Sequence, residues 1–350
     1  MAAAGGPPGV RERRNVSDAA GVALLAACAV WSLFAAASRQ GRPEGVLLAV
    51  LAVAAGYACG RITGALLPVA APCAAALAGL VFAATAPPAT PGPDLASPLG
   101  DAGATAALLA LSTGAACTAA WATEQPALRL ALRSLAAGIV VSAAVLGSTA
   151  GVVACAGVLL YSLAADRMRR RGLGLAGLGA ATVLVAGLFF AVIEDVLPDG
   201  LAASLEGQLT QHRVLLWRDA LDLAGREPVL GVGPGRFGEL SPTVAQTLVA
   251  DGRPHSAPLQ QAAEQGVVGV ILLAAVFCWL LYALWRSPRA TPVALTAGAA
   301  LTALAVMALV GNALSFTTVT AGGGLLAGLA TSRSWGDEIA HGFPDTQERS

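Results

Sequence analysis

Charged residues are scarce in this sequence, and lysine is missing altogether. Only 12% of the 350 residues are charged, and the 21 basic residues, all of them arginines, balance 21 acidic ones. Soluble domains carry about 25% charged residues, so the composition excludes an ordinary soluble enzyme. The formal net charge of zero leaves no basic footprint for nucleic acid, and a content of 56% hydrophobic residues excludes a disordered chain.

Patterns that form disulfides or bind metals are also missing. The six cysteines lie in apolar runs and form no C-x-x-C pair: Cys28, Cys59, Cys73, Cys117, Cys155 and Cys278. We therefore expect small buried hydrophobic side chains rather than disulfides or a zinc site, and we expect neither a metal nor a cofactor. Histidine is equally rare, since only His212, His255 and His341 occur.

Long apolar runs dominate what is present. A helix of about 20 residues crosses the hydrocarbon core of a bilayer, and ten runs reach or approach this length. They cover roughly residues 19–37, 45–60, 64–86, 103–122, 132–148, 149–165, 172–193, 266–285, 292–311 and 314–331. The sequence therefore predicts an all-α membrane protein with about ten transmembrane helices.

Arginine clusters predict the direction of these spans. They precede the first span and follow the sixth and the eighth: Arg11, Arg13 and Arg14; Arg167, Arg169, Arg170 and Arg171; Arg286 and Arg289. Because cytoplasmic loops are enriched in arginine, we expect both termini in the cytoplasm, with 14 arginines inside and 7 outside. The predicted location is the cytoplasmic (inner) membrane.

The same pattern divides the chain into five parts. They are a flexible cytoplasmic tail (1–18), an N-terminal bundle of about seven spans (19–193), an extracytoplasmic loop domain (194–265), about three C-terminal spans (266–331) and a second cytoplasmic tail (332–350). The proline-rich stretch 87–102 is predicted to be a stiff outer connector. The loop 194–265 is the only polar stretch of domain length and holds ten of the 21 acidic residues, so we expect any active site there or at the membrane face beneath it.

Glycines four residues apart recur within the spans. The pairs are Gly56 with Gly60, Gly60 with Gly64, Gly147 with Gly151 and Gly324 with Gly328. Small residues at this spacing let membrane helices approach each other closely. We therefore expect these pairs to lie where helices pack together.

Helical periodicity marks residues 201–225 of the loop domain. One face of this helix carries Arg213, Trp217, Ala220, Leu221 and Ala224. The pattern predicts an amphipathic helix at the membrane surface, with Trp217 at the level of the headgroups. An arginine on such a face must find an anion or a carbonyl group. Guanidinium groups match phosphate geometry, so Arg213 is either an anion-binding residue or a snorkelling or ion-paired one.

A glycine-rich turn follows over residues 231–238 and reads Gly-Val-Gly-Pro-Gly-Arg-Phe-Gly. No Gly-Lys-Ser/Thr follows it and no strand–helix–strand pattern surrounds it, which argues against nucleotide binding. Glycines of this kind let the backbone approach another backbone segment or a lipid phosphate. Both interpretations stay open at this point.

His255 stands just before the chain returns to the membrane. A histidine near neutral pH can take a proton from a hydroxyl group, and an arginine can hold a diphosphate leaving group. In combination, His255 and Arg213 suit transfer of a group from a lipid diphosphate to a hydroxyl.

Three stretches in this order resemble the core motif of the O-antigen ligase and polymerase superfamily. They read Arg213-x3-Trp217-x2-Ala220, then Pro228-x2-Gly231-x-Gly233-x-Gly235-x-Phe237, then His255-Ser256-x2-Leu259-Gln260-x3-Glu264-x-Gly266-x2-Gly269. The hydropathy pattern fits the family over roughly 140–331. Its members are bacterial integral membrane glycosyltransferases of cell-envelope polysaccharide biosynthesis, and they use glycans linked to undecaprenyl diphosphate outside the cytoplasmic membrane.

The resemblance implies roles for individual residues. It implies a metal-independent, inverting transferase that moves a polyprenyl-diphosphate-linked glycan onto a hydroxyl of a lipid, a glycan or a protein. Arg213 would contact the donor diphosphate, and His255 would act as the base toward the acceptor hydroxyl or help to position it. Supporting residues in the same motif would be Trp217, Gly233, Gly235, Arg236, Arg253 and Glu264.

Three departures from the family pattern leave alternatives open. Ser256 replaces the usual asparagine after the histidine, the hairpin 147–151 lacks the arginine of the family's Ser-Arg-Gly, and Asn312 stands where members often carry a polar, sometimes acidic, residue. Candidates to replace the missing arginine are Arg39, Arg42, Arg236 and Arg253. The alternatives to a ligase or polymerase are a catalytically degenerate partner in envelope assembly and a transporter of lipid-linked glycans.

Overall fold

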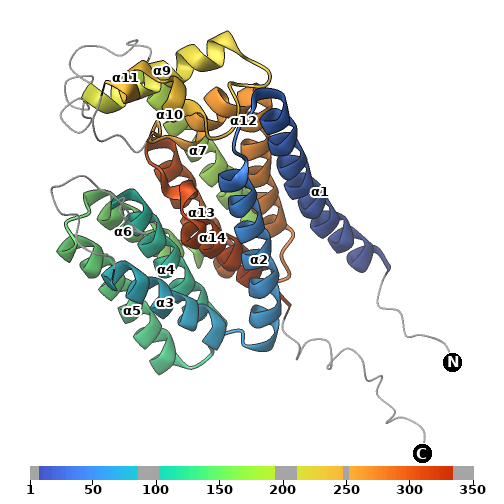
Figure 1. Cartoon of the computed structure of the whole chain (residues 1–350). Coiled ribbons are helices and arrows are strands. Elements are labelled where there is room, and N and C mark those ends of the chain that lie inside the picture. The colour runs from blue at the N-terminus through green and yellow to red at the C-terminus, as the bar shows by residue number, and fades with distance from the viewer. Residues whose placement is uncertain (1–7, 86–101, 194–210, 247–251, 334–350) are drawn as a thin grey trace, which may run out of the picture.

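The computed structural model describes residues 8–85, 102–193, 211–246 and 252–333, and every regular element in these ranges is a helix (Figure 1). The helices that overlap the expected spans are α1 (Pro8–Arg39), α2 (Glu44–Leu66), α3 (Ala70–Thr85), α4 (Ala102–Ala122), α5 (Pro126–Val145), α6 (Thr149–Ala165), α7 (Arg171–Ile193), α12 (Ala257–Trp285), α13 (Thr291–Val310) and α14 (Thr317–Thr331). Shorter elements of the loop regions are α9 (Gln211–Arg226), α10 (Phe237–Leu240), α11 (Pro242–Ala245) and the 3-10 turn η1 (Ala313–Ser315). The all-α prediction is confirmed.

Within the described residues, seven helices are long and apolar enough to cross a membrane, and α3 and α6 are shorter apolar helices. All ten apolar runs expected from the sequence overlap a helix. The chain is therefore a multi-pass membrane protein, while the number of ten spans stays a prediction.

Several helix boundaries differ from the expected ones, including the start of the third helix, at Ala70, and the start of α12, at Ala257. The first helix begins at Pro8, where a flexible tail was predicted over 1–18. The second continues to Leu66, because the chain breaks at Leu67 and Pro68 rather than at the glycines before them. The fifth starts early, at Pro126, since proline suits the first turn of a helix. The predicted connector over 87–102, the start of the loop helix and most of the C-terminal tail lie outside the described residues.

Helices α4 and α13 form the centre of the bundle. Their membrane-sized windows are 89% and 78% buried within the protein, whereas that of α2 is 6% buried and faces outward. Alanine, glycine, serine and threonine make up most of α4, and such small side chains let neighbours pack closely on every side. The main hydrophobic core accordingly runs through α4, α6 and α13.

A seam of glycines joins α2 to α14. A Cβ atom on Gly56 or Gly60 would overlap the carbonyl oxygen of Ala321 or Leu325, and one on Gly324 or Gly328 would overlap the backbone of α2. The predicted close packing at these spacings is confirmed. The pair at 147–151 is different: the first glycine has φ +71° and open space around it, so it serves the turn between α5 and α6 rather than a helix contact.

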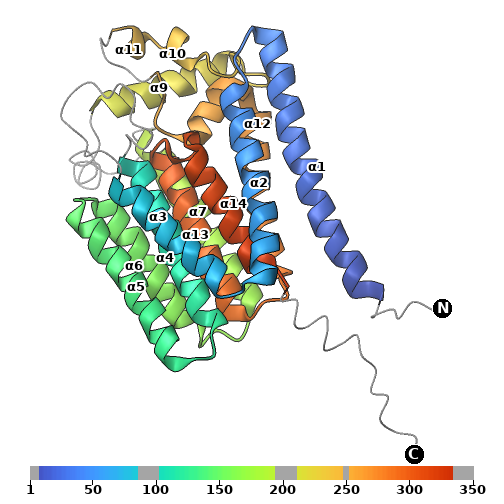
Figure 2. The same cartoon turned by 60° about the horizontal axis from the view of Figure 1, so that its bottom comes forward.

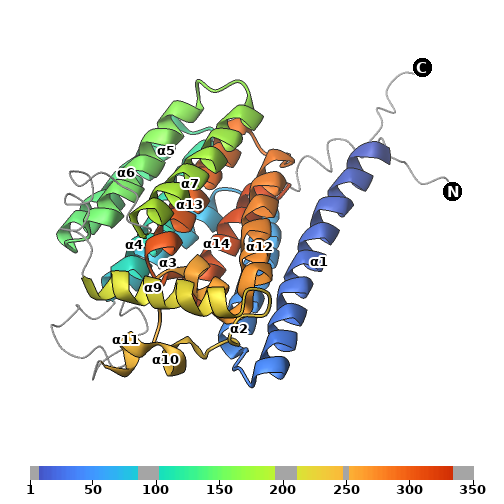
Figure 3. The same ribbon diagram turned by 90° about the horizontal axis from the view of Figure 1, so that it is seen from above.

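The two ends of the bundle carry different structures. Helices α9, α10 and α11 gather at one end (Figures 1 and 2), and from above α9 lies across the ends of α7 and α12 (Figure 3). At the other end, Ser17 of α1 and Arg333, just after α14, line one cavity. The start of α1 and the end of α14 thus lie on one side of the bundle (Figure 1), and the arginine distribution predicts that this side is cytoplasmic.

Candidate functional site

The motif region is built around a break in helix α12. Gly266 has φ 67° and ψ −165°, so the segment before it turns away from the segment after it. A break leaves the last carbonyl groups of the first segment and the first N–H groups of the second without helical partners. Buried backbone groups of this kind must be satisfied elsewhere.

The glycine-rich turn supplies those partners together with helix α1. Four hydrogen bonds cross the break: Val232 N to Ala263 O (2.8 Å), Gly233 N to Glu264 O (3.0 Å), Trp31 Nε1 to Gln265 O (3.1 Å) and Val267 N to Pro228 O (2.8 Å). The backbone of the turn therefore packs against α12 at the break and forms the hydrogen bonds that the helix lacks there.

Glycine is required at this contact for steric reasons. A Cβ atom on Gly266 would overlap the carbonyl group of Val229, and one on Gly231 would overlap the backbone of Glu264. Gly233 and Gly235 lie against Arg39 and Arg42 of the turn between α1 and α2, with φ values of +106° and +73°. Of the two interpretations that the sequence left open, the structure supports close backbone approach.

Arginines brace the same turn from the other side. Arg39 forms an ion pair with Glu227, and Arg42 pairs with Glu239 at 3.1 Å. Arg236 donates to the carbonyl oxygen of Arg39 at 2.8 Å and lies 3.6 Å from Glu239. Three of the four candidates to replace the missing hairpin arginine are thus engaged in holding the glycine-rich turn.

The side chain of Glu264 holds the glycine-rich turn in place through hydrogen bonds with its backbone. Its side chain is buried, and its carboxylate accepts hydrogen bonds from the backbone N–H groups of Gly235 and Phe237, with Gln260 Nε2 at 3.4 Å. The exposed Arg253 lies close enough to act on it electrostatically. The acid of the motif therefore holds the loop, and it does so through contacts that its sequence position alone did not indicate.

Helix α9 packs on the first segment of α12 through a small hydrophobic core. Trp217 is fully buried with its ring 4.6 Å from that of Phe189 in α7, and Leu259 and Ala263 of α12 belong to the same core. The predicted headgroup position of Trp217 is wrong, because the apolar face of this helix meets protein rather than lipid.

Polar contacts fix α9 to the neighbouring short helix. Asp219 accepts hydrogen bonds from Ser241 Oγ at 2.5 Å and from the backbone N–H of Thr243 at 3.0 Å. Arg213 lies in the first turn of α9, one turn before Trp217, and is half-buried. The packing of Trp217 thus determines where the Arg213 guanidinium group can reach.

His255 is held in an unusual backbone conformation directly before α12. Its φ of +51° lies in the left-handed region, which costs a non-glycine residue about 1–2 kcal/mol. Its neighbours Pro254 and Ser256 are buried, and Ser256 is the N-cap residue of α12. Strain of this kind persists only where the surroundings enforce it, and it is typical of functional sites.

The side chain of His255 meets a residue from a distant part of the sequence. Asn312 Nδ2, in the turn between α13 and α14, lies 3.2 Å from His255 Nδ1. Asn312 is 4% exposed, whereas His255 is half-buried. The sequence marked Asn312 only as a departure from a family pattern, because nothing local indicates a contact across 57 residues.

This contact controls which ring nitrogen carries the proton. If the Asn312 nitrogen donates to Nδ1, the neutral ring carries its proton on Nε2; if the amide turns by 180°, its oxygen accepts from Nδ1–H and leaves Nε2 free as a base. Hydrogen bonds at one ring nitrogen set the role of the other. Asn312 is therefore able to present His255 either as a donor or as a base.

Comparison with known proteins agrees with this architecture. The O-antigen ligase family model matches residues 134–274, about two fifths of the chain. The match begins within α5 and ends beyond the break in α12, so it includes α9, the glycine-rich turn and His255. No curated protein matches the sequence. Residues 134–274 are therefore similar to the O-antigen ligase family.

Proposed function

We propose that this protein transfers a glycan from a polyprenyl-diphosphate donor to an acceptor hydroxyl at the membrane face that carries α9, α10 and α11. The observation that carries the proposal is His255, which lies in the stretch that matches the O-antigen ligase family, is held at φ +51° and contacts Asn312 from outside that stretch. A histidine that is strained and oriented in this way suits acid–base chemistry, and Arg213 lies on α9, which packs on the helix that His255 precedes.

The proposed step is a single displacement at the anomeric carbon. Nε2 of His255 takes the proton of the acceptor hydroxyl as its oxygen attacks that carbon. The bond between the anomeric carbon and the diphosphate oxygen breaks, and the diphosphate leaves with its lipid. Arg213 offsets the charge that develops on the leaving group. Attack opposite the leaving group inverts the configuration of the sugar.

Replacing Arg213 by glutamine is expected to raise the KM for the lipid-diphosphate donor by roughly 10- to 150-fold, the equivalent of one charge-assisted hydrogen bond. The KM for the acceptor should change little. The KM for the donor and the KM for the acceptor are measured separately, from initial rates in which the concentration of one substrate is varied while the other is held constant. Arg226→Gln is the matched control, because this exposed arginine lies in the last turn of the same helix and pairs with Asp222. An unchanged donor KM in Arg213→Gln would remove that residue from the site.

Deletion of the gene is expected to make undecaprenyl-diphosphate-linked glycan accumulate in the membrane, as measured by mass spectrometry of extracted lipids. Wild-type protein should restore the normal pool. Accumulated single repeats indicate a blocked polymerase, and accumulated long chains indicate a blocked ligase. An unchanged pool contradicts the proposal and favours a partner in envelope assembly, whereas a pool confined to the cytoplasmic leaflet favours a transporter.

A further inference from the structure

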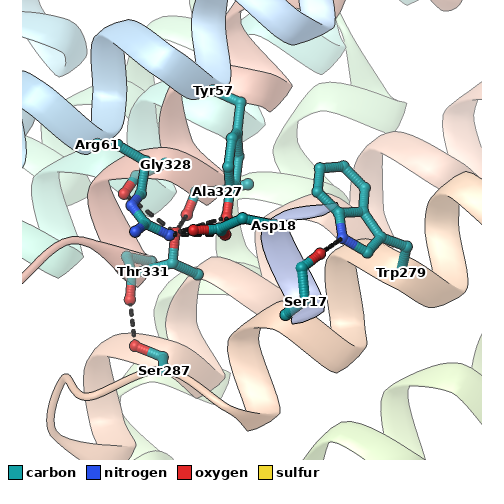
Figure 4. A network of polar contacts seen from close by, with 10 residues as sticks. Ser17, Asp18, Tyr57, Arg61, Trp279, Ser287, Ala327, Gly328 and Thr331 are labelled. Carbon is teal, nitrogen blue, oxygen red and sulfur yellow. Dashed lines mark hydrogen bonds and ion pairs between the residues drawn. The ribbon is translucent and has the colours of Figure 1, made fainter. Parts of the chain in front are cut away.

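A cavity of about 200 Å³ lies at the end of the bundle opposite His255. It opens among α1, α2, α12 and α14, and Figure 4 shows the part of its polar wall around Asp18, Tyr57 and Arg61. The charged lining residues are Asp18, Arg61, Arg286 and Arg333, and the other polar ones are Ser17, Tyr57, Ser287 and Thr331. This cavity belongs to no part of the O-antigen ligase motif, and its chemistry is dominated by arginine.

The acidic residue of this cavity is already neutralised. Arg61 Nη1 lies 3.1 Å from Asp18 Oδ1 and 3.2 Å from the Tyr57 hydroxyl, which itself donates to Asp18 at 3.3 Å. Thr331 Oγ1 approaches the same hydroxyl at 3.3 Å (Figure 4). The Asp18 carboxylate thus pairs with Arg61 and Tyr57, and its negative charge does not neutralise Arg286 or Arg333.

Arg286 and Arg333 have no ion-pair partner in the part of the chain that the structure describes. Arg286 is exposed and stacks over the Trp285 ring at 5.7 Å, and Arg333 is half-buried. With Arg61 balanced by Asp18, the lining carries a net charge of two positive units.

Two other arginines at this end of the bundle, Arg171 and Arg289, form hydrogen bonds with backbone carbonyl groups. Arg171 donates to the carbonyl oxygens of Ser287 and Arg289, and Arg289 donates to the carbonyls of Gly64 and Ser332. Basic side chains at helix C-termini commonly satisfy such carbonyl groups. Arg286 and Arg333 differ from this group because no such contact holds them within the described ranges.

We propose that this cavity binds the phosphate of an anionic phospholipid headgroup. Guanidinium groups match the geometry of phosphate and can bind it bidentately. Arg286 directly follows the membrane helix α12, whose last turn carries Tyr282 and Trp285, and aromatic residues of this kind mark the headgroup level. The arginine distribution places this end in the cytoplasmic leaflet, which carries the negative surface potential. The proposal is independent of the chemistry at His255.

The test uses the full-length protein in zwitterionic nanodiscs, titrated with phosphatidylglycerol, with phosphatidylcholine or with inorganic phosphate, and read by native mass spectrometry and thermal unfolding. Phosphatidylglycerol should bind and raise the unfolding temperature, whereas phosphatidylcholine should not. The double variant Arg286→Gln/Arg333→Gln should weaken phosphatidylglycerol binding by about 30-fold, the effect of removing two membrane-facing charges. Arg226→Gln, which carries its change at the opposite end, should bind like wild type.

Three results would overturn the assignment. Equal binding of phosphatidylglycerol by the double variant and by wild type would place the lipid elsewhere. Saturation by inorganic phosphate at the same concentration, with no lipid effect, would assign the cavity to a soluble phosphate. Lipid binding that emerges only after removal of residues 334–350, which include Asp337 and Glu338, would show that the chain's own acids fill the cavity. The double variant should unfold like wild type in phosphatidylcholine alone, since Arg286 is exposed.

Discussion

Replacing His255 by alanine is expected to lower kcat for glycan transfer by about 10²- to 10⁴-fold, the usual contribution of a positioned general base. The acceptor hydroxyl would then lose its proton to water, whereas the donor would still bind through the remaining contacts. Purified protein in proteoliposomes, supplied with a polyprenyl-diphosphate glycan and an acceptor, allows turnover to be followed by mass spectrometry. Unchanged turnover in His255→Ala would contradict the catalytic role and leave the partner interpretation standing.

A double-mutant cycle with Asn312 tests whether the two residues act as a unit. Asn312→Leu removes the contact with His255 Nδ1 and should lower kcat. In the His255→Ala background, the same substitution should lower kcat little further. Asn312→Asp can only accept a hydrogen bond, so it fixes the proton on Nδ1 and keeps Nε2 free as the base. Retained turnover in Asn312→Asp together with loss in Asn312→Leu would identify an orienting role, which a purely structural contact does not predict.

Backbone strain at His255 provides the folding control for this experiment. Because φ is +51°, glycine adopts the local conformation more easily than alanine, by about 1 kcal/mol. His255→Gly should therefore be at least as stable as His255→Ala, although both lose activity. If His255→Gly unfolds at the same temperature as wild type and still lacks turnover, the loss cannot be attributed to unfolding.

The sequence was sufficient to predict the helical membrane architecture and to predict that the glycine pairs of α2 and of α14 lie at close helix contacts, although it did not indicate that these two helices pack on each other. Both depend on local information, because a membrane helix must satisfy its own backbone groups and bury an apolar run of fixed length. Gly60 and Gly328 were recognisable for the same reason, since their spacing along one helix already implies close approach. The order and spacing of the motif likewise indicated the family that the domain match later supported.

Long-range contacts were beyond the reach of sequence patterns. The pairing of His255 with Asn312 and the contact of Trp31 with Gln265 join segments whose separation leaves no periodicity to read. Trp217 illustrates a second limit. An amphipathic face records that one side of a helix avoids water, but it does not record whether protein or lipid covers that side.

Gly266→Ala is expected to lower the free energy of unfolding by about 3 kcal/mol or more, through overpacking and backbone strain combined. The residue has φ 67°, and the added Cβ would overlap the carbonyl group of Val229. Relief requires the glycine-rich turn to move away from α12, which breaks the 2.8 Å bond from Val267 N to Pro228 O. The measurement is thermal unfolding of the purified protein in one detergent, followed by the loss of helical circular dichroism.

Gly138→Ala is the matched control for this substitution. Gly138 lies within α5 and a Cβ there meets open space, so alanine should be neutral or should stabilise the helix by up to about 1 kcal/mol. A Gly266→Ala variant as stable as this control would mean that the break in α12 is not held by the glycine-rich turn. Because the same break positions His255 one helix segment away, destabilisation of Gly266→Ala should be accompanied by loss of transfer activity even below its unfolding temperature.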